Sequence, residues 1–169
     1  KGVFKMSCFS FMPLKPESIN TYLSGIYDIL HTNMSKIAPT GNTYEEDKAM
    51  WTSCVKPALG QNRRDMILIF KENELVGFFQ YYVNSETFMM DEIQFKPEYQ
   101  GSGLFTELYR YLIKIIPAET QYTEAYASKK NLKSQAILKH LGLEIIGENK
   151  NGNSYHFQGE YKRLIERYS

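Results

Sequence analysis

The chain has 169 residues, with 20 lysines and arginines against 19 aspartates and glutamates. This length is typical of one domain that buries its own core, so we expect residues 1–169 to form a single domain. The formal net charge of +1 gives no broad basic field, and a nucleic-acid partner is therefore not expected. Hydrophobic residues make up 43% of the chain and charged residues 23%, a balance that excludes a disordered protein.

The two cysteines, Cys8 and Cys54, are too few for a disulfide framework and form no Cys-x-x-Cys pair. This usage favours a reducing, cytoplasmic location. No stretch approaches the roughly 18–20 apolar residues of a membrane span, and the first residues lack the pattern of a signal peptide. We therefore expect no membrane partner.

The first third of the chain predicts one strand and two helices. Loose alternation over Val3–Met12 is typical of a strand. Apolar residues at helical spacing then predict an amphipathic helix that begins near Pro16. A capping box at Thr43 predicts a second helix, which should end before Pro57 or near Gly60.

The hydrophobic period changes after residue 65. The runs Met66–Phe70, Leu75–Val83 and Thr87–Phe95 are separated by short polar turns and predict a three-stranded meander. The later pattern predicts a helix over 104–115, a strand over 122–127, a helix over 131–141, strands over 143–148 and 155–159, and one or two helical turns within 160–168. This order favours an α/β (α+β) fold with a mixed, largely antiparallel sheet of roughly six to seven strands and helices on both faces.

A turn with two glycines joins the strand that ends at Phe95 to the helix that begins at Leu104. The first backbone N–H groups of a helix have no internal acceptor and lie at the positive end of its dipole, so they attract phosphate. Gly101 and Gly103 let an anion approach this backbone without a Cβ in the way. Thr106 excludes the three-glycine dinucleotide fingerprint, and neither a P-loop nor a nucleophile elbow is present. A tight turn without a ligand is the alternative.

Two motifs resemble those of the GNAT superfamily of acyl-coenzyme A N-acyltransferases. The string Gln100-x-x-Gly103-x-Phe105 is similar to its Q/R-x-x-G-x-G/A motif. A helix that opens at Asn131 and ends in the pair Gly142-Leu143 is similar to its second signature. The two motifs occur in the order and at the separation that the superfamily shows.

The resemblance also assigns the cofactor contacts. It implies a sheet splayed between strands 87–95 and 122–127, with acetyl-CoA as cosubstrate in the opening. By similarity, Ile93 and Phe95 pair with the pantetheine arm through their backbone, and Asn131 contacts the cofactor near its reactive end. The amides that would hold the pyrophosphate belong to Gln100, Gly101, Ser102, Gly103, Leu104 and Phe105.

Acyl transfer to an amine needs a base for the amine and a proton for the leaving thiolate. Asp91 and Glu92 precede the cofactor-contacting part of the strand, where the resemblance implies an acidic base. Strand alternation puts them on opposite faces unless a bulge resets the count. We favour Glu92 as the base; a surface carboxylate paired with a lysine is the alternative. Leu138 replaces the family's usual tyrosine donor, so Tyr126, His140 or water would protonate the thiolate, and Tyr126 is otherwise a packing residue.

Phe105 stands where the family usually has Gly or Ala, and we expect its side chain to point into the protein so that its amide still reaches phosphate. The three histidines show no metal-ligand spacing, so no metal is expected. Arg63 and Arg64 are interpreted as solvated loop charges.

The preferred interpretation is an acetyl-CoA-dependent N-acetyltransferase whose acceptor is the amine of a small molecule or a protein. One alternative is a catalytically silent coenzyme A-binding regulatory or interaction domain, which the leucine at position 138 keeps open. Another is a ligand-binding domain unrelated to coenzyme A. The C-terminal strands are compatible with a homodimer.

Overall fold

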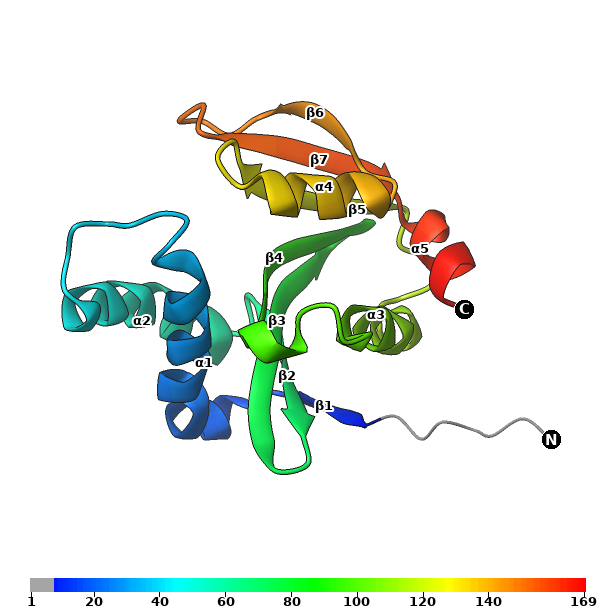
Figure 1. Ribbon diagram of the computed structural model, residues 1–169. Coiled ribbons are helices and arrows are strands. Elements are labelled where there is room, and N and C mark those ends of the chain that lie inside the picture. Colours follow the sequence, from blue (N-terminus) through cyan, green and yellow to red (C-terminus); the bar gives the residue numbers. More distant parts are fainter. Residues whose placement is uncertain (1–7) are drawn as a thin grey trace.

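The computed structural model describes residues 8–169 as one open, seven-stranded sheet with helices on both faces (Figure 1). The strands are β1 Phe9–Pro13, β2 Asp65–Lys71, β3 Glu74–Asn84, β4 Thr87–Phe95, β5 Tyr122–Ser128, β6 Glu144–Glu148 and β7 Ser154–Glu160. The helices are α1 Ile19–Met34, α2 Tyr44–Gly60, α3 Leu104–Ile115, α4 Leu132–His140 and α5 Tyr161–Tyr168, with short 3₁₀ turns at Pro16–Ser18 and Pro97–Tyr99. The expected fold class is confirmed, and the part of the first expected strand before residue 8 lies outside the described residues. Within residues 8–169, no helix combines the length and the apolar character that crossing a membrane requires.

The strand order is β1-β2-β3-β4-β5-β7-β6. All neighbours are antiparallel except β4 and β5, which run parallel. This parallel ladder is short, because it runs only from Thr87 beside Tyr122 to Met90 beside Ala125. Beyond Met90, β3 is the only described strand that pairs with β4. The sheet therefore divides at this point into a β1–β4 part and a β5–β7 part.

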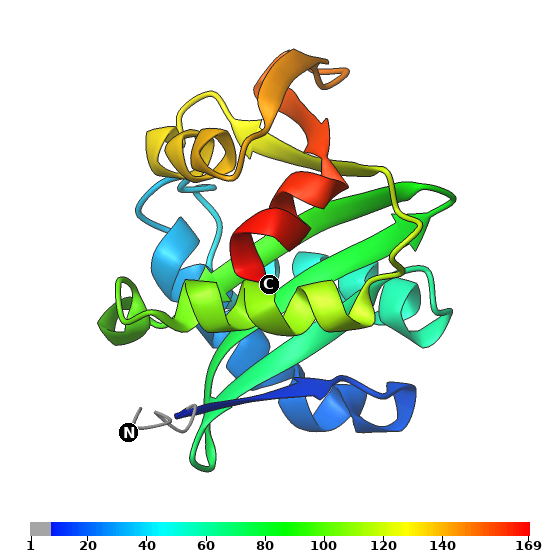
Figure 2. The same ribbon diagram turned by 90° about the vertical axis from the view of Figure 1, so that its right-hand side faces the viewer.

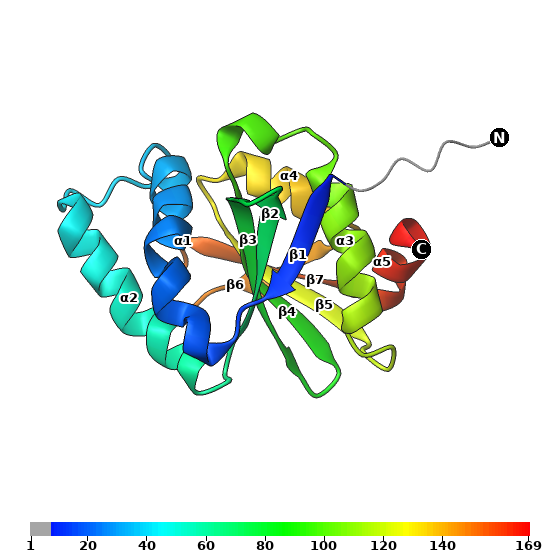
Figure 3. The ribbon, with the colours of Figure 1, turned by 90° about the horizontal axis from the view of Figure 1, so that it is seen from below.

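Helices α1 and α2 lie on one face of the sheet, and α3 and α5 lie on the other (Figure 3). Figure 2 shows α3 and α5 side by side, where they pack against each other. Each face has its own apolar core. The core beneath α1 and α2 includes Ile26, Leu68 and Phe78, and the core on the other face includes Phe79, Leu108 and Tyr161.

Helix α2 starts where the sequence predicts. The Thr43 side chain accepts a hydrogen bond from the Glu46 backbone N–H, and the Thr43 N–H donates to the Glu46 carboxylate at 2.8 Å. This capping box satisfies donors that the first turn leaves free. The helix continues through Pro57 to Gly60, the later of the two expected ends, and Pro57 is accommodated in its last turn.

A β-bulge in β4 lies where β4 and β5 part. Gln80 of β3 pairs with Glu92, and its neighbour Tyr81 pairs with Met90. Asp91 is therefore an extra residue without a partner on β3.

The bulge corrects the expected alternation of β4. A regular strand would put Glu92 and Gln94 on the face of Phe88, in the core beside α3. With the extra residue, Glu92 and Gln94 lie instead on the face of Met89, toward α1, and Ile93 packs against the core that contains Phe88. The bulge that the sequence left open as an alternative is therefore present, and this one residue resets the period of two.

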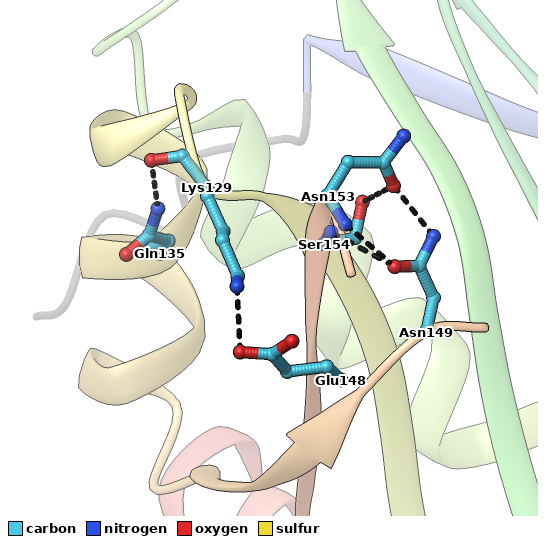
Figure 4. A network of polar contacts seen from close by, with 6 residues as sticks. All are labelled: Lys129, Gln135, Glu148, Asn149, Asn153 and Ser154. Carbon is cyan, nitrogen blue, oxygen red and sulfur yellow. Dashed lines mark hydrogen bonds and ion pairs between the residues drawn. The ribbon is translucent and has the colours of Figure 1, made fainter. Parts of the chain in front are cut away.

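The β6–β7 hairpin is tied to the turn between β5 and α4 (Figure 4). The Lys129 ammonium lies 2.6 Å from a Glu148 carboxylate oxygen. The Gln135 amide donates to the Lys129 carbonyl at 3.0 Å, and Asn149 binds the hairpin turn through Asn153 and Ser154. These contacts hold the end of β5 and the start of α4 in place beside the opening of the sheet.

Candidate active site

The glycine turn before α3 has the geometry of an anion cradle. Gly101 and Gly103 have φ angles of +79° and +87°, the left-handed region that favours glycine. A Cβ built on either glycine meets no atom within 4 Å, so the turn is open on that side. Among the described residues, no group accepts a hydrogen bond from the backbone N–H of Gly103, Leu104 or Phe105. The first turn of α3 can therefore bind phosphate oxygens without losing an existing contact.

The backbone N–H groups of Gln100 and Ser102, which were also expected to hold the pyrophosphate, donate instead to the Pro97 and Tyr99 carbonyls within the turn. The side chains of the turn shape it further. Gln100 donates to the Phe95 carbonyl at 3.3 Å and accepts from the Lys133 ammonium at 2.8 Å, so it links β4, the turn and α4. The Ser102 hydroxyl donates to the Tyr99 carbonyl. The Phe105 ring packs inward on Tyr109, with ring centroids 4.6 Å apart. Phe105 therefore leaves its amide on the open side, as expected.

The two backbone groups expected to pair with pantetheine are not equally free. Ile93 and Phe95 both turn their side chains into the core beside α3. The Phe95 carbonyl, however, accepts hydrogen bonds from Asn33 of α1 at 2.8 Å and from Gln100 at 3.3 Å. A pantetheine amide at this carbonyl would have to share it with those donors.

The second motif forms the start of α4. The Asn131 side chain caps this helix by accepting from the Ser134 N–H at 3.0 Å, which leaves its amide N–H₂ group for another acceptor. Leu138 is buried in the core beside α3. The position at which the family usually has a tyrosine is therefore a packing position in this chain.

Glu92 is the best candidate for a general base. The Gln94 side-chain amide donates to the Glu92 carboxylate at 2.6 Å, and the Asn33 side chain donates to the Gln94 side-chain oxygen at 2.9 Å. Asn33 thereby fixes which end of the Gln94 amide faces Glu92. Burial raises the pKa of Glu92 to about 7, while the Gln94 hydrogen bond lowers it and the charge of Asp91 raises it. The partly exposed carboxylate can therefore gain and lose a proton near neutral pH.

Asp91 has a different environment from Glu92. Its carboxylate lies 2.5 Å from the Arg64 Nε, and the Arg64 guanidinium lies 3.9 Å from the centre of the Tyr82 ring. Gln80 also donates to Asp91, at 3.4 Å. The interpretation of Arg64 as a solvated loop charge was wrong, because this ion pair and ring contact hold it against the sheet. Asp91 is committed to Arg64 and is the weaker base candidate.

Tyr126 lies on β5, one residue beyond the last pair with β4. Its side chain is 47% exposed, and its ring stacks on His156 of β7 with centroids 4.4 Å apart and an interplanar angle of 12°. The His156 Nε2 atom lies 2.8 Å from a Glu124 oxygen, and Gln158 donates to the other Glu124 oxygen at 2.7 Å. Tyr126 thus packs on a histidine at the surface rather than in the core.

Sequence reasoning missed Glu124 and His156. The available signal was weak: both are polar residues that alternate with apolar ones within short strands, which is also the pattern of any half-exposed strand. Among residues 8–169, no group of three or more His, Cys, Asp or Glu side chains is placed to hold a metal ion.

Comparison with known sequences gives one family. The model of the acetyltransferase (GNAT) family matches residues 23–143, which include the glycine turn, both carboxylates and the second motif. No curated protein matches the chain.

Solved structures share the fold at low sequence identity. A PaiA N-acetyltransferase from Thermoplasma acidophilum, in complex with coenzyme A, is 17% identical with a TM-score of 0.71, covering 92% of this chain and 100% of the other. The aminoglycoside acetyltransferase AAC(6')-Ib with coenzyme A is 16% identical with a TM-score of 0.66, covering 95% and 99%. Mutant forms of the spermidine/spermine N-acetyltransferase SpeG from Vibrio cholerae are 11% identical with a TM-score of 0.60, covering 96% and 99%. At such identities these likenesses concern the fold alone.

Proposed function

Because the chain belongs to the acetyltransferase (GNAT) family and is therefore an acyltransferase, we propose that it transfers an acetyl group from acetyl-CoA to a primary amine. The transfer is a direct attack in a ternary complex. The acceptor is a small molecule or a protein, and Glu92 is the general base. The observation that carries this proposal is the Glu92 carboxylate itself, with a pKa of about 7 beside a bulge at the point where β4 and β5 part.

The cofactor end of the site is the turn before α3. The free backbone N–H groups of Gly103, Leu104 and Phe105 would bind the pyrophosphate of acetyl-CoA, and the side chain of Gln100 steadies that turn. The exposed backbone edge of β4 beyond Met90 leads from this turn toward Glu92. A pantetheine arm along this edge would bring the thioester to the carboxylate.

Glu92 performs the proton transfer that the amine requires. An ammonium acceptor has no free electron pair, so Glu92 removes one proton, directly or through a water molecule. The amine nitrogen then attacks the thioester carbon, a C–N bond forms and the C–S bond breaks. The attacking nitrogen still carries a second proton, and this proton passes to the leaving thiolate through the Tyr126 hydroxyl or a water molecule, since Leu138 offers none, so that a neutral amide and a free thiol are formed.

Acetyl-CoA binding and thiol release test this proposal. We expect isothermal titration with acetyl-CoA to give a Kd below about 1 mM, and a panel of primary amines to release free thiol. Glu92→Gln keeps the shape of the side chain and should lower kcat/KM by about 10²–10⁴. The matched control is Glu119→Gln in the exposed loop before β5. Absence of acetyl-CoA binding, or a Glu92→Gln loss no greater than that of the control, contradicts the proposal.

The role of Tyr126 is tested separately. Tyr126→Phe removes the hydroxyl and keeps the ring that stacks on His156. A fall in kcat of about tenfold or more at unchanged KM supports Tyr126 as the proton donor. An unchanged kcat assigns that proton to water.

A further inference from the structure

Four side chains of β5 and β7 form a polar cluster, of which the mechanism above uses only the Tyr126 hydroxyl, as one of two alternative proton donors. We call Glu124, Tyr126, His156 and Gln158 the distal cluster. Both Glu124 carboxylate oxygens are held, one by His156 at 2.8 Å and the other by Gln158 at 2.7 Å. The Glu124 and His156 side chains are only 16% and 21% exposed, whereas Tyr126, whose ring stacks on His156, is 47% exposed. Hydrogen bonds therefore hold Glu124 and His156 in place, whereas Tyr126 remains accessible from solvent.

The distal cluster lies on the same face of the sheet as Glu92. Paired residues of neighbouring strands point to the same face, and Glu124 pairs with Met89, which shares the face of Glu92. Tyr126 pairs with His156 in turn. Glu124 lies one strand spacing of about 4.8 Å from β4, and Glu92 lies beyond its partner Met89 by three residues of about 3.3 Å each, so the two carboxylates are roughly 10 Å apart. One extended small molecule can span that distance.

The charges on this face favour a cation at the distal cluster. Arg64 compensates Asp91, with its guanidinium over the Tyr82 ring. Glu124, by contrast, has no lysine or arginine partner among the described residues, and its oxygens are held by the His156 imidazole and the Gln158 amide. No described cation lies over the Tyr126 ring. A carboxylate beside an open aromatic face is chemistry that recognises an ammonium or guanidinium group.

We propose that the distal cluster is an acceptor subsite that binds a second cationic group of the substrate, about 10 Å from the amine that is acetylated. Glu124 supplies the charge, the Tyr126 ring supplies a cation–π contact, and His156 and Gln158 hold both in place. This inference rests on the proposed acetyltransferase function. Beyond that function, it specifies that the acceptor carries two cationic groups and that the distal cluster recognises one of them.

Two matched probes test the subsite. Diaminooctane carries an ammonium group at each end, and the amino alcohol of the same length replaces one ammonium by a neutral hydroxyl. We expect the wild-type protein to favour the diamine in kcat/KM by about tenfold or more, beyond the factor of two from its two equivalent amines. Diaminopropane is too short to span the sites and should show no such advantage.

The Glu124→Gln variant keeps the size of the side chain and one acceptor oxygen and removes the charge. The ratio of kcat/KM for the diamine to that for the amino alcohol should fall to about the statistical factor of two. Glu166→Gln, on the exposed side of α5 on the opposite face, should leave the ratio as in the wild type. Tyr126→Leu should also lower the ratio, whereas Tyr126→Phe, which keeps the ring, should not. Because Tyr126 is exposed, its variants test the subsite even if Glu124→Gln is unstable.

A binding measurement separates this inference from the proposed function. Isothermal titration of diaminooctane into the protein with coenzyme A requires no turnover. Binding that weakens about tenfold in Glu124→Gln supports the subsite even if the chain acetylates none of the amines tested. A wild-type protein that acetylates amines but treats the diamine and the amino alcohol alike overturns the subsite and leaves the acetyltransferase proposal intact.

Discussion

The two sides of the proposed active site are built from different groups of atoms. On the cofactor side, the turn before α3 offers backbone N–H groups, and its side chains only steady the loop. On the acceptor side, the face of β3, β4, β5 and β7 offers side chains: Glu92 held by Gln94, Asp91 held by Arg64, and Glu124 held by His156. A backbone cradle depends on where glycines permit an unusual φ, whereas a side-chain surface depends on which strands meet. The first can therefore serve one constant ligand while the second changes with the acceptor.

The largest expected effect on ligand binding concerns the cofactor side alone. Gly103→Ala adds a Cβ at a φ of +87°, so we expect about 1–2 kcal/mol of destabilisation from backbone strain. Acetyl-CoA binding should weaken by a further tenfold to hundredfold, because the N–H groups at the start of α3 lose their alignment to phosphate. The measurements are a thermal melt and isothermal titration.

Gly41→Ala is the matched control for that change. Gly41 has a φ of +82° in the loop before α2, and a Cβ there also meets nothing within 4 Å. The two variants should lose similar stability, and only the one at Gly103 should lose cofactor affinity. Equal affinities in both variants contradict the cradle.

The next effect concerns the acceptor side, where burial of the ionised Glu92 carboxylate lowers the free energy of unfolding. Its rise in pKa from 4.5 to about 7 means that the folded state binds a proton more tightly than the unfolded state, so the free energy of unfolding falls as pH rises across this range. The upper limit is about 3 kcal/mol, which partial exposure reduces to about 1–2 kcal/mol. Glu92→Gln should therefore be more stable than the wild type at pH 8 but not at pH 4. Urea unfolding at both pH values measures this, and an equal or lower stability of the variant at pH 8 contradicts it.

A smaller effect is expected from the chain of hydrogen bonds behind Glu92. Gln94→Leu removes a hydrogen bond that lowers the pKa of Glu92, so that pKa should rise above 7 and the base should ionise only at higher pH. We expect kcat/KM at pH 7 to fall about tenfold and its pH profile to move to the alkaline side. Asn33→Ala frees the Gln94 amide without removing it and should move the profile less, in the same direction. An unchanged profile in Gln94→Leu means that Gln94 has only a packing role.

The smallest effect is expected at the Asp91–Arg64 pair. Both side chains are partly exposed, so Arg64→Met should cost less than about 1 kcal/mol of stability. Asp91 then lacks its counter-charge and should raise the pKa of Glu92 slightly, with less than a threefold change in kcat/KM at pH 7. Acetyl-CoA affinity should not change. A loss as large as that of Glu92→Gln would make Asp91, rather than Glu92, the critical carboxylate.

The contrast between the two sides also explains what the sequence could predict. The element order, the turn and the inward Phe105 follow from local patterns, namely periodicity, caps and glycines, and the structure agrees with them. The face of Glu92 could not be derived, because a bulge is visible only in the register between β3 and β4. Arg64 and His156 gain their partners across 27 and 32 residues of chain, and one sequence carries no signal for such contacts.

The ladder of four residue pairs between β4 and β5 is a short connection between the β1–β4 and β5–β7 parts of the sheet. Besides this ladder, the β5–β7 part is held against β1–β4 by the packing of α3 with α5, by the core contact of Phe88 with Tyr161 and by the hydrogen bond from Lys133 to Gln100. A ligand that lies between β4 and β5 where they part would contact both parts of the sheet and stabilise their arrangement. At a hundredfold excess over its Kd it should add about 2.7 kcal/mol to the free energy of unfolding. Amide hydrogens of β4 beyond Met90 should then exchange more slowly with solvent, because the cosubstrate would connect the β1–β4 and β5–β7 parts of the sheet.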